Sequence, residues 1–255
     1  MNIFNDIIAQ VDRYKHAACR PGGYRTFTAD NYPAWPGAKN RNIILMPDLA
    51  VEFGSPETAS VSFGVWTGDD ALVHDEQITL IGPDVTETLK KQNPFGKIVI
   101  TGVQGFDETN AFERNREIYL KKFDLALKGH MLKSASHYMA EWHRISQTAV
   151  KDGFSFGHLG SALIREIKTL AYVKAVEVIF VTTSDEDVTA LYDLGKQSTR
   201  IIQAMSKMVN EMTVNCADCE YQDVCEDTSK LRRLRAELIK NKWGAAPVPE
   251  GGHAN

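Results

Sequence analysis

The pattern of apolar and polar residues predicts a chain in which strands and helices alternate. Apolar residues at positions 3, 4, 7, 8 and 11 have helical spacing, which predicts an amphipathic helix over residues 2–14 that packs against the rest of the protein. Short apolar runs between turns predict strands at 43–46, 60–66, 77–82, 97–102 and 175–182. Such alternation is typical of an α/β fold, here a mixed β-sheet with flanking helices.

Helical patterns fill most of the remaining sequence. We expect helices at 84–91, over most of 107–149 with a break near Gly129, at 154–170, and from Ser184 to about Met212. A last, basic helix is expected at 230–242. The predicted organisation is an N-terminal helix and extended arm at 1–41, an α/β domain at 42–212, a cysteine loop and basic helix at 213–243, and a disordered tail at 244–255.

Length and composition indicate a globular protein of the cytoplasm. The chain has 255 residues, 43% of them hydrophobic, which is enough for a sizeable core. No apolar run approaches the roughly 18 residues of a membrane span, and the first residues lack the basic start of a signal peptide. A net charge of −4 gives no support to nucleic-acid binding.

Three of the four cysteines lie within ten residues, at Cys216, Cys219 and Cys225. The C-x2-C-x5-C spacing brings soft thiolates together, as a metal ion or an iron–sulfur cluster requires. A closed zinc site needs four ligands, and no cysteine or histidine follows Cys225 until His253. We therefore favour a [4Fe–4S] cluster, with a structural zinc site or three unligated thiols as alternatives. Candidates for a fourth ligand are Cys19, Asp218, Asp223 and Glu226.

Several short motifs resemble one family. They are EFGSPETASVSF at 52–63, ITLIGPD at 78–84, WHRIS at 142–146, KDGFS at 151–155 and HLG at 158–160, followed by the cysteine loop. In this order they are similar to the central domain of acetyl-CoA synthase, the subunit that works with carbon monoxide dehydrogenase. The resemblance covers roughly residues 43–226.

The resemblance implies metal chemistry at the cysteines. In the family, the corresponding cysteines belong to a [4Fe–4S] cluster that is bridged to nickel, and a Cys-Gly-Cys segment holds a second nickel. Cys216, Cys219 and Cys225 match the first three cluster ligands, although the family has a longer gap before the third. No Cys-Gly-Cys segment is found here. We therefore expect a truncated or divergent homologue that is not a complete synthase alone, because the reaction needs the nickel pair to hold its two carbon groups together.

Trp142 and Arg144 match family positions that are associated with CoA. An indole can stack on adenine, and a guanidinium can pair with phosphate. The alternative is that Trp142 is a core aromatic residue of a helix and Arg144 a surface cation. His130, His137 and His143 fall in the same predicted helix. The first two would lie about 10 Å apart along it, too far for one metal ion, so we interpret these histidines as surface or core residues.

Two further functions fit the same residues. The first is an iron–sulfur module for electron transfer or scaffolding, whose basic helix at 230–242 would dock an acidic partner such as a ferredoxin or a CO dehydrogenase subunit. The second is an interaction domain stapled by zinc, without a redox role. The sequence names no catalytic residue.

Overall fold

Two β-sheets and the helices around them form the structure, a computed structural model that describes residues 2–17, 23–38, 44, 49–107, 109–135, 139–210, 219–227 and 231. The strands are β1 (Tyr24–Thr28), β2 (Ala50–Phe53), β3 (Ser60–Thr67), β4 (Gln77–Ile81), β5 (Gln92–Asn93), β6 (Phe95–Val103), β7 (His130–Ala135), β8 (Ala140–Ser146) and β9 (Val173–Val181). The helices are α1 (Asn5–Ala17), α2 (Ala111–Leu120), α3 (Gln147–Lys151), α4 (Phe156–Lys168), α5 (Asp185–Thr189), α6 (Tyr192–Asn210) and α7 (Gln222–Asp227), with short 3-10 turns η1 (Ala29–Asn31), η3 (Asp70–Leu72) and η4 (Lys121–Phe123).

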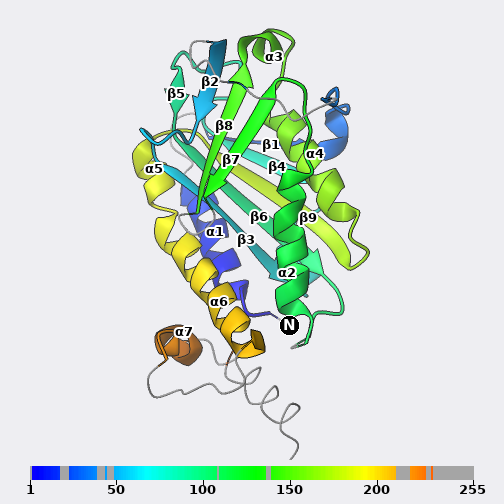
Figure 1. Ribbon diagram of the computed structural model, residues 1–255, viewed down its shortest axis with the longest axis vertical. Helices are drawn as coiled ribbons and strands as arrows, with labels where there is room; N and C mark the ends of the chain where they lie inside the picture. Colours follow the sequence, from blue (N-terminus) through cyan, green and yellow to red (C-terminus); the bar gives the residue numbers. More distant parts are fainter. Residues whose placement is uncertain are drawn as a thin grey trace, which may run out of the picture.

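The larger sheet has five strands in the order β1-β4-β9-β6-β3 (Figure 1). The central strands β6 and β9 run antiparallel to each other, and each has a parallel neighbour on its outer side, β3 and β4. All residues of β6 are buried, and so are all residues of β9 except Lys174. Burial on both faces explains why these strands are continuous apolar runs in the sequence. The predicted mixed α/β fold is thus confirmed.

The smaller sheet has the order β5-β2-β8-β7 and contains the main error of the sequence-based prediction. Residues 107–149 were expected to be mostly helical, but only α2 and the short α3 are helices there, and β7 and β8 form an antiparallel hairpin between them. The hairpin pairs with β2 through β8. Its residues have strand conformation because tertiary pairing overrides a local pattern that also suits a helix.

Ser60 joins the two sheets at one corner. Its hydroxyl donates to the carbonyl oxygen of Glu141 at 2.9 Å and accepts from the Glu141 amide at 3.0 Å. Next to it, the Ser62 amide donates to the carbonyl oxygen of Met139 at 2.6 Å. The start of β3 is therefore attached to the start of β8, which holds the hairpin over one face of the large sheet.

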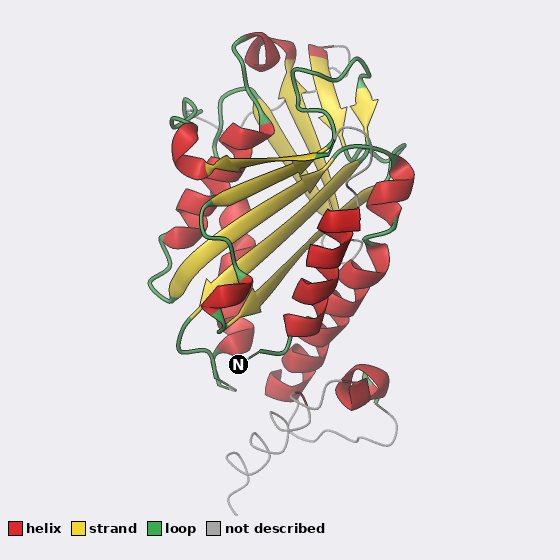
Figure 2. Ribbon diagram, turned by 180° about the vertical axis from the view of Figure 1, so that it is seen from behind, coloured by secondary structure: helices red, strands yellow, loops and turns green. Residues whose placement is uncertain are grey.

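Helices cover both faces of the large sheet. α1 packs on the face that carries Ile100 and Ile179, seen from behind in Figure 2. α2 lies over the opposite face, which carries Val99 and Thr101. α6 follows the edge strand β3, where the Ser198 hydroxyl donates to the carbonyl oxygen of Gly64 at 2.9 Å. The edge is thereby covered rather than left open for association.

Other sequence-based predictions have mixed outcomes. The helices expected at 2–14 and 154–170 are present as α1 and α4, whereas the helix expected from Ser184 is divided into α5 and α6, and 84–91 is not helical. Within the expected N-terminal arm, β1 pairs with β4. The expected strand at 43–46, except Ile44, the basic helix, except Leu231, and the tail lie outside the described residues. In the described part of the chain, no helix has the length and apolar character needed to cross a membrane.

Candidate functional site

The β7–β8 hairpin displays two different sets of side chains because successive residues of a strand face opposite sides. On one side of β8 lie Trp142 and Arg144, which contact Glu52 of the neighbouring strand β2. On the other side lie Glu141 and His143, both almost completely buried. One strand therefore contributes to an open groove on one side and to a buried charge cluster on the other.

Trp142 and Arg144 lie next to each other on one face of β8, and both contact the carboxylate of Glu52. The Trp142 indole N–H donates to Oε2 of Glu52 at 3.2 Å, and Nε of Arg144 lies 2.8 Å from Oε1 of the same carboxylate. The Arg144 guanidinium lies 4.4 Å from the centre of the Trp142 ring. Arg144 is buried, and its Nη1 donates to the carbonyl oxygen of Ile44 at 2.7 Å. It is not the surface cation of the alternative interpretation, and Glu52 already provides it with a counter-charge.

The half-buried Trp142 lines a groove of about 430 Å³. Other walls come from the turn after β2, with Gly54, Ser55 and Thr58, and from β7, with Lys133 and Ser134. The Lys133 ammonium lies 4.6 Å from the centre of the Trp142 ring. An aromatic surface, hydroxyl groups and an exposed cation together suit a ligand that has a flat ring and negative charge.

Glu141 is the centre of the buried charge cluster. Its Oε2 lies 2.5 Å from Nζ of Lys97 on β6, and its Oε1 lies 2.8 Å from Nζ of Lys122 on η4. Nε2 of His143 lies 3.3 Å from Oε2, and Nδ1 of His143 lies 2.9 Å from Nε2 of His130. The five side chains come from β6, η4, β7 and β8, so only the folded sheets bring them together.

The electrostatics of this cluster follow from its burial. Burial by itself would raise the pKa of Glu141, but Lys97, with help from His143 and Lys122, holds that pKa well below its usual range. Burial lowers the pKa of Lys97, and Glu141 offsets only part of this effect. Burial also lowers the pKa of His143, and lowers that of His130 further. The ionised Glu141 is thus surrounded by two lysines and two neutral histidines.

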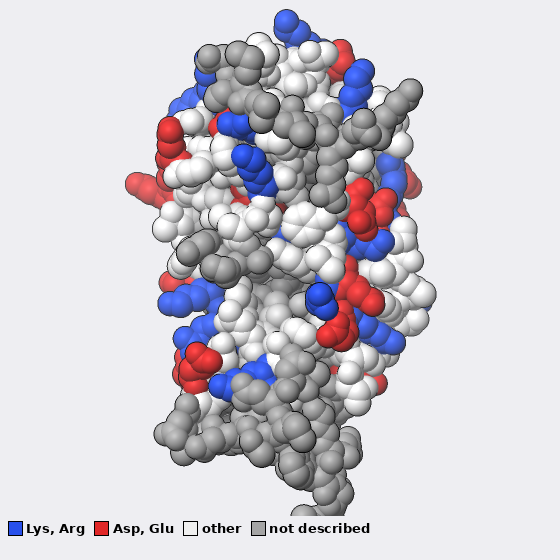
Figure 3. Space-filling view, viewed as in Figure 1, with Lys and Arg blue, Asp and Glu red and all other residues white. Residues whose placement is uncertain are grey.

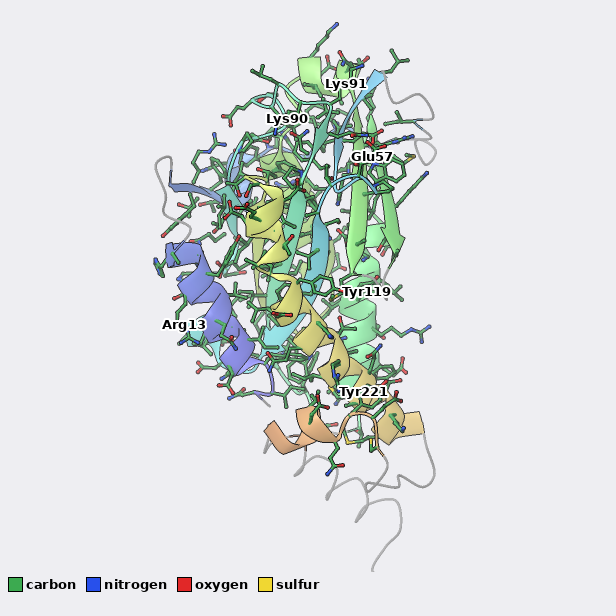
Figure 4. All side chains as sticks on the ribbon, turned by 90° about the vertical axis from the view of Figure 1, so that its left-hand side faces the viewer. Arg13, Glu57, Lys90, Lys91, Tyr119 and Tyr221 are labelled. Atoms are coloured by element: carbon green, nitrogen blue, oxygen red, sulfur yellow. The ribbon has the colours of Figure 1, made fainter. Side chains whose placement is uncertain are left out.

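Residues 219–227, the described part of the cysteine loop and here called the cysteine segment, lie at the far end of α6, away from the hairpin (Figure 1). Cys219 is a free, half-buried cysteine just before α7, and its carbonyl oxygen accepts from the Gln222 amide at 3.1 Å. Two cations of α6 hold this segment: Arg200 pairs with Asp223 at 2.5 Å, and Lys207 pairs with Glu220 at 3.6 Å. Lys207 also lies 5.7 Å from the ring centre of Tyr221, which is labelled in Figure 4.

Comparison with known families identifies the chain. The family described as the CO dehydrogenase/acetyl-CoA synthase complex beta subunit (CdhC) matches residues 33–188, more than half of the sequence. The chain belongs to this family. The resemblance inferred from the motifs is therefore confirmed. A search of curated proteins gave no match.

The CdhC match covers some candidate residues and not others. It contains every strand from β2 to β9, and with them Trp142, Arg144 and the whole Glu141 cluster. It ends at residue 188, before α6 and the cysteines. The groove and the buried cluster therefore lie within the part of the chain that matches the family. The cysteines lie outside it, and their role as metal ligands is inferred from their spacing.

Among the described side chains of residues 219–227, the thiol of Cys219 is the one candidate cysteine ligand. Arg200 and Lys207 of α6 are each paired with a carboxylate, Asp223 and Glu220, so they supply no excess positive charge for an anionic metal group. Thiolates are the ligands that iron–sulfur clusters and zinc prefer. Asp223, one of the candidate fourth ligands, is instead paired with Arg200. Cys216 and the side chain of Cys225 lie outside the described residues, and among those that are described no group of three His, Cys, Asp or Glu suits a metal ion.

The sequence-based reasoning missed the Glu141 cluster. The sequence pattern predicts that His130 and His143 share one helix, whereas they lie on paired strands, with their rings hydrogen-bonded. His137 lies outside the described residues. One signal was present: Lys97 is the one charged residue of the buried strand β6, and a charge in a buried strand needs a buried partner. A helix over 140–146 would not pair with β7, so the sequence pattern does not identify Glu141 as that partner.

Proposed function

We propose that this chain serves the CO dehydrogenase/acetyl-CoA synthase system as a subunit that binds CoA beside Trp142 and carries an iron–sulfur cluster on Cys216, Cys219 and Cys225. The observation that carries the proposal is the groove of about 430 Å³ lined by Trp142, which lies within the part of the chain that matches the CdhC family. Trp142 and Arg144 are the residues expected from the resemblance to contact CoA.

The groove has the chemistry that a nucleotide-containing ligand requires. Trp142 offers an indole for stacking of the adenine ring, and Lys133 supplies an exposed positive charge for phosphate. Arg144 acts in this proposal mainly by holding the indole, because its guanidinium faces both Trp142 and Glu52. The volume accommodates part of a CoA molecule, so the remainder would extend over the surface.

Calorimetric titration of CoA tests this half of the proposal. Trp142→Ala should weaken binding by about 1–3 kcal/mol, the usual loss when a base–aromatic stack is removed. Lys133→Met should also weaken it, whereas Lys174→Met is a matched control because Lys174 is exposed on β9, away from the groove. Equal CoA affinity for the wild type and Trp142→Ala would contradict the proposal.

Arg144 needs a paired substitution, since removing it alone leaves Glu52 buried without its counter-charge. The double variant Glu52→Gln/Arg144→Gln removes both charges together. If Arg144 contacts phosphate, the double variant binds CoA more weakly than Glu52→Gln alone. If Arg144 only holds the indole, the two variants differ in Trp142 fluorescence but share the same dependence of CoA affinity on salt.

The cluster half of the proposal rests on the spacing of the cysteines and on the resemblance that matches them to cluster ligands of the family. It requires a reducing compartment, such as the cytoplasm, that keeps the thiols available as ligands. Anaerobic purification followed by iron, sulfide, nickel and zinc analysis tests it, together with EPR of the reduced protein. We expect about four iron atoms per chain, and loss of iron in Cys216→Ser, Cys219→Ser and Cys225→Ser. Loss of iron in Cys19→Ser as well would identify the fourth ligand.

One other function uses the same cluster. In an electron-transfer or scaffolding module that partners CO dehydrogenase or a ferredoxin, the cluster would be reducible and the groove would bind no CoA. The two functions differ in the CoA titration alone, so that experiment decides between them. Stoichiometric zinc in place of iron in anaerobic protein would instead favour an interaction domain stapled by zinc.

A further inference from the structure

A small cavity lies beside the Glu141 cluster, on the opposite side of β8 from the groove. It has a volume of about 60 Å³ and lies between β3 and β6 of the large sheet and the helix α2. Most of its wall is apolar, with Val99 of β6 and Ile118 of α2 facing the space. Its charged lining residues are Lys97, Lys122 and Glu141, and the uncharged polar residues Ser62, Thr101 and Asn115 line it as well. Tyr119 also lines it and is partly exposed on α2 (Figure 4).

Positive charge exceeds negative charge in this wall. The ammonium groups of Lys97 and Lys122 share the single carboxylate of Glu141. His130 and His143, which continue the cluster, are held neutral by burial, which lowers their pKa values. Burial lowers the pKa of Lys97, and Glu141 offsets only part of this effect because Lys122 shares the same carboxylate. A further negative charge beside Lys97 would hold it as an ammonium ion.

The Lys97 ammonium also has more N–H donors than hydrogen-bond acceptors around it. An ammonium group has three N–H donors. Among the residues that the structure describes, Glu141 is the one acceptor for the Lys97 ammonium, although the side chain is only 5% exposed. Lys122 is better satisfied, because its ammonium also donates to the Ser134 hydroxyl at 3.1 Å and lies 3.7 Å from the Tyr119 ring centre. The unsatisfied donors of Lys97 therefore belong to a buried group that lines the cavity.

We propose that this cavity binds a short-chain monocarboxylate, whose carboxylate accepts hydrogen bonds from Lys97 and whose alkyl end packs against Val99 and Ile118. One further negative charge would let Lys97 and Lys122 both be charged beside Glu141, which favours a monoanion over a dianion or a phosphate ester. A buried water molecule occupies about 10–15 Å³ of cavity volume measured in this way. A cavity of about 60 Å³ therefore has room for about four to six non-hydrogen atoms. Acetate, propionate and butyrate have this size, and the apolar wall favours an alkyl tail over an inorganic anion.

Titration of the full-length protein with propionate, followed by calorimetry, tests the proposal. We expect saturable binding of one propionate per chain, with chloride and the neutral analogue propionamide binding at least about tenfold more weakly. Lys97→Met should weaken propionate binding by at least about tenfold, or about 1.4 kcal/mol. Propionamide binding as tightly as propionate, or a folded Lys97→Met protein with wild-type affinity, would overturn the proposal.

A second variant decides the question if Lys97→Met does not fold. Val99→Ile adds a methyl group to the apolar wall and leaves all charges in place, so it should reduce the affinity for butyrate more than that for acetate. Ile98→Val is the matched control, because Ile98 is a buried neighbour on β6 that does not line the cavity. Equal losses of affinity in the two variants would refute the cavity as the binding site. Neither measurement depends on the cysteines or on the CoA groove.

Discussion

Nε2 of His130 lies 2.9 Å from Nδ1 of His143, so two buried imidazoles share one hydrogen bond. Nε2 of His143 faces the ionised carboxylate of Glu141 at 3.3 Å and must therefore carry the proton. In a neutral His143, Nδ1 is then an acceptor, and His130 is the donor to it. The carboxylate thus fixes the tautomer of His143 and, through it, the direction of the hydrogen bond from His130.

This pair makes the stability of the protein depend on pH. Both histidines have folded-state pKa values lowered by burial, so below about pH 6.5 the unfolded chain binds protons that the folded chain does not. The two histidines should therefore have little effect on the free energy of unfolding above that pH. Below it, the free energy of unfolding should decrease by up to about 1.4 kcal/mol per pH unit for each histidine. Urea unfolding at pH 7.5, 6.5 and 5.5 measures this slope.

Variants assign the slope to the pair. His130→Gln keeps an N–H donor for His143 but removes one titrating group, so the loss of stability between pH 6.5 and 5.5 should decrease. His16→Gln is the control, because His16 is exposed at the end of α1. Glu141 does not contribute in this range, since its lowered pKa affects stability only below about pH 4.5. An unchanged slope in His130→Gln would contradict the assignment.

The Glu141 carboxylate should be essential for the cluster. Glu141→Gln leaves Lys97 and Lys122 buried without a counter-charge, and we expect a loss of about 3–5 kcal/mol in the free energy of unfolding. Adding Lys97→Met should recover a large part of this loss, because the second substitution removes the stranded charge. A double-mutant cycle by chemical denaturation measures this coupling. Additive effects of the two substitutions would show that they do not form one electrostatic unit.

The elements that sequence predicts well are those whose local pattern agrees with their tertiary surroundings. α1 and α4 have one apolar stripe, and β9 is a continuous β-branched run, so pattern and burial agree. The hairpin β7–β8 differs, because its residues Glu141, His143 and Arg144 are buried polar groups with no apolar alternation to mark a strand. Their partners Lys97, His130 and Glu52 lie on other strands. The pairing of these strands supplies the hydrogen bonds and opposite charges that offset the free-energy cost of burying the polar groups.

The candidate sites also differ in how far the sequence alone predicts them. Trp142 could be selected from the sequence because the family motif marks it, and in the structure it lines a groove. The cavity beside Lys97 could not be selected, because its wall combines residues of β3, β6, α2 and β8 that are distant in the chain.

Asp84 should contribute to stability by accepting hydrogen bonds rather than by its charge. Its Oδ1 accepts from the Phe156 amide at the start of α4, at 2.8 Å, and from the Val85 amide at 2.7 Å. Burial raises the pKa of Asp84, although these two amides partly offset the effect. Asp84→Asn keeps an acceptor and should change stability little, whereas Asp84→Ala should lose about 1–3 kcal/mol by leaving buried amides unsatisfied.

Thermal unfolding of both Asp84 variants tests this expectation. Asp69→Ala is the control, since Asp69 accepts from the Ala71 amide at 3.1 Å in an exposed turn where water can replace it. Asp69→Ala should therefore lower the stability of the protein less than Asp84→Ala does. If Asp84→Asn were as destabilising as Asp84→Ala, the charge rather than the hydrogen bonds would be decisive.

Gly54 should be required for the approach of the two sheets. Its backbone has φ = +69°, and a Cβ atom there would overlap the carbonyl oxygen of Glu141 and lie 2.8 Å from the Ser60 hydroxyl. Gly23 has a similar φ of +60° with no atom within 4 Å of an added Cβ. Both Gly→Ala substitutions therefore share a conformational penalty of about 1–2 kcal/mol. Only Gly54→Ala adds a steric penalty of about 1–3 kcal/mol.

The difference between the two variants in chemical denaturation isolates that steric penalty. Because the overlap is with the backbone of β8, Gly54→Ala should also displace the corner where Ser60 bonds to Glu141. Gly54 lines the groove beside Trp142, so the same substitution should change the indole fluorescence, and Gly23→Ala should not. Equal destabilisation by the two substitutions would mean that the sheets can separate at this corner without loss, and that the hairpin is held elsewhere.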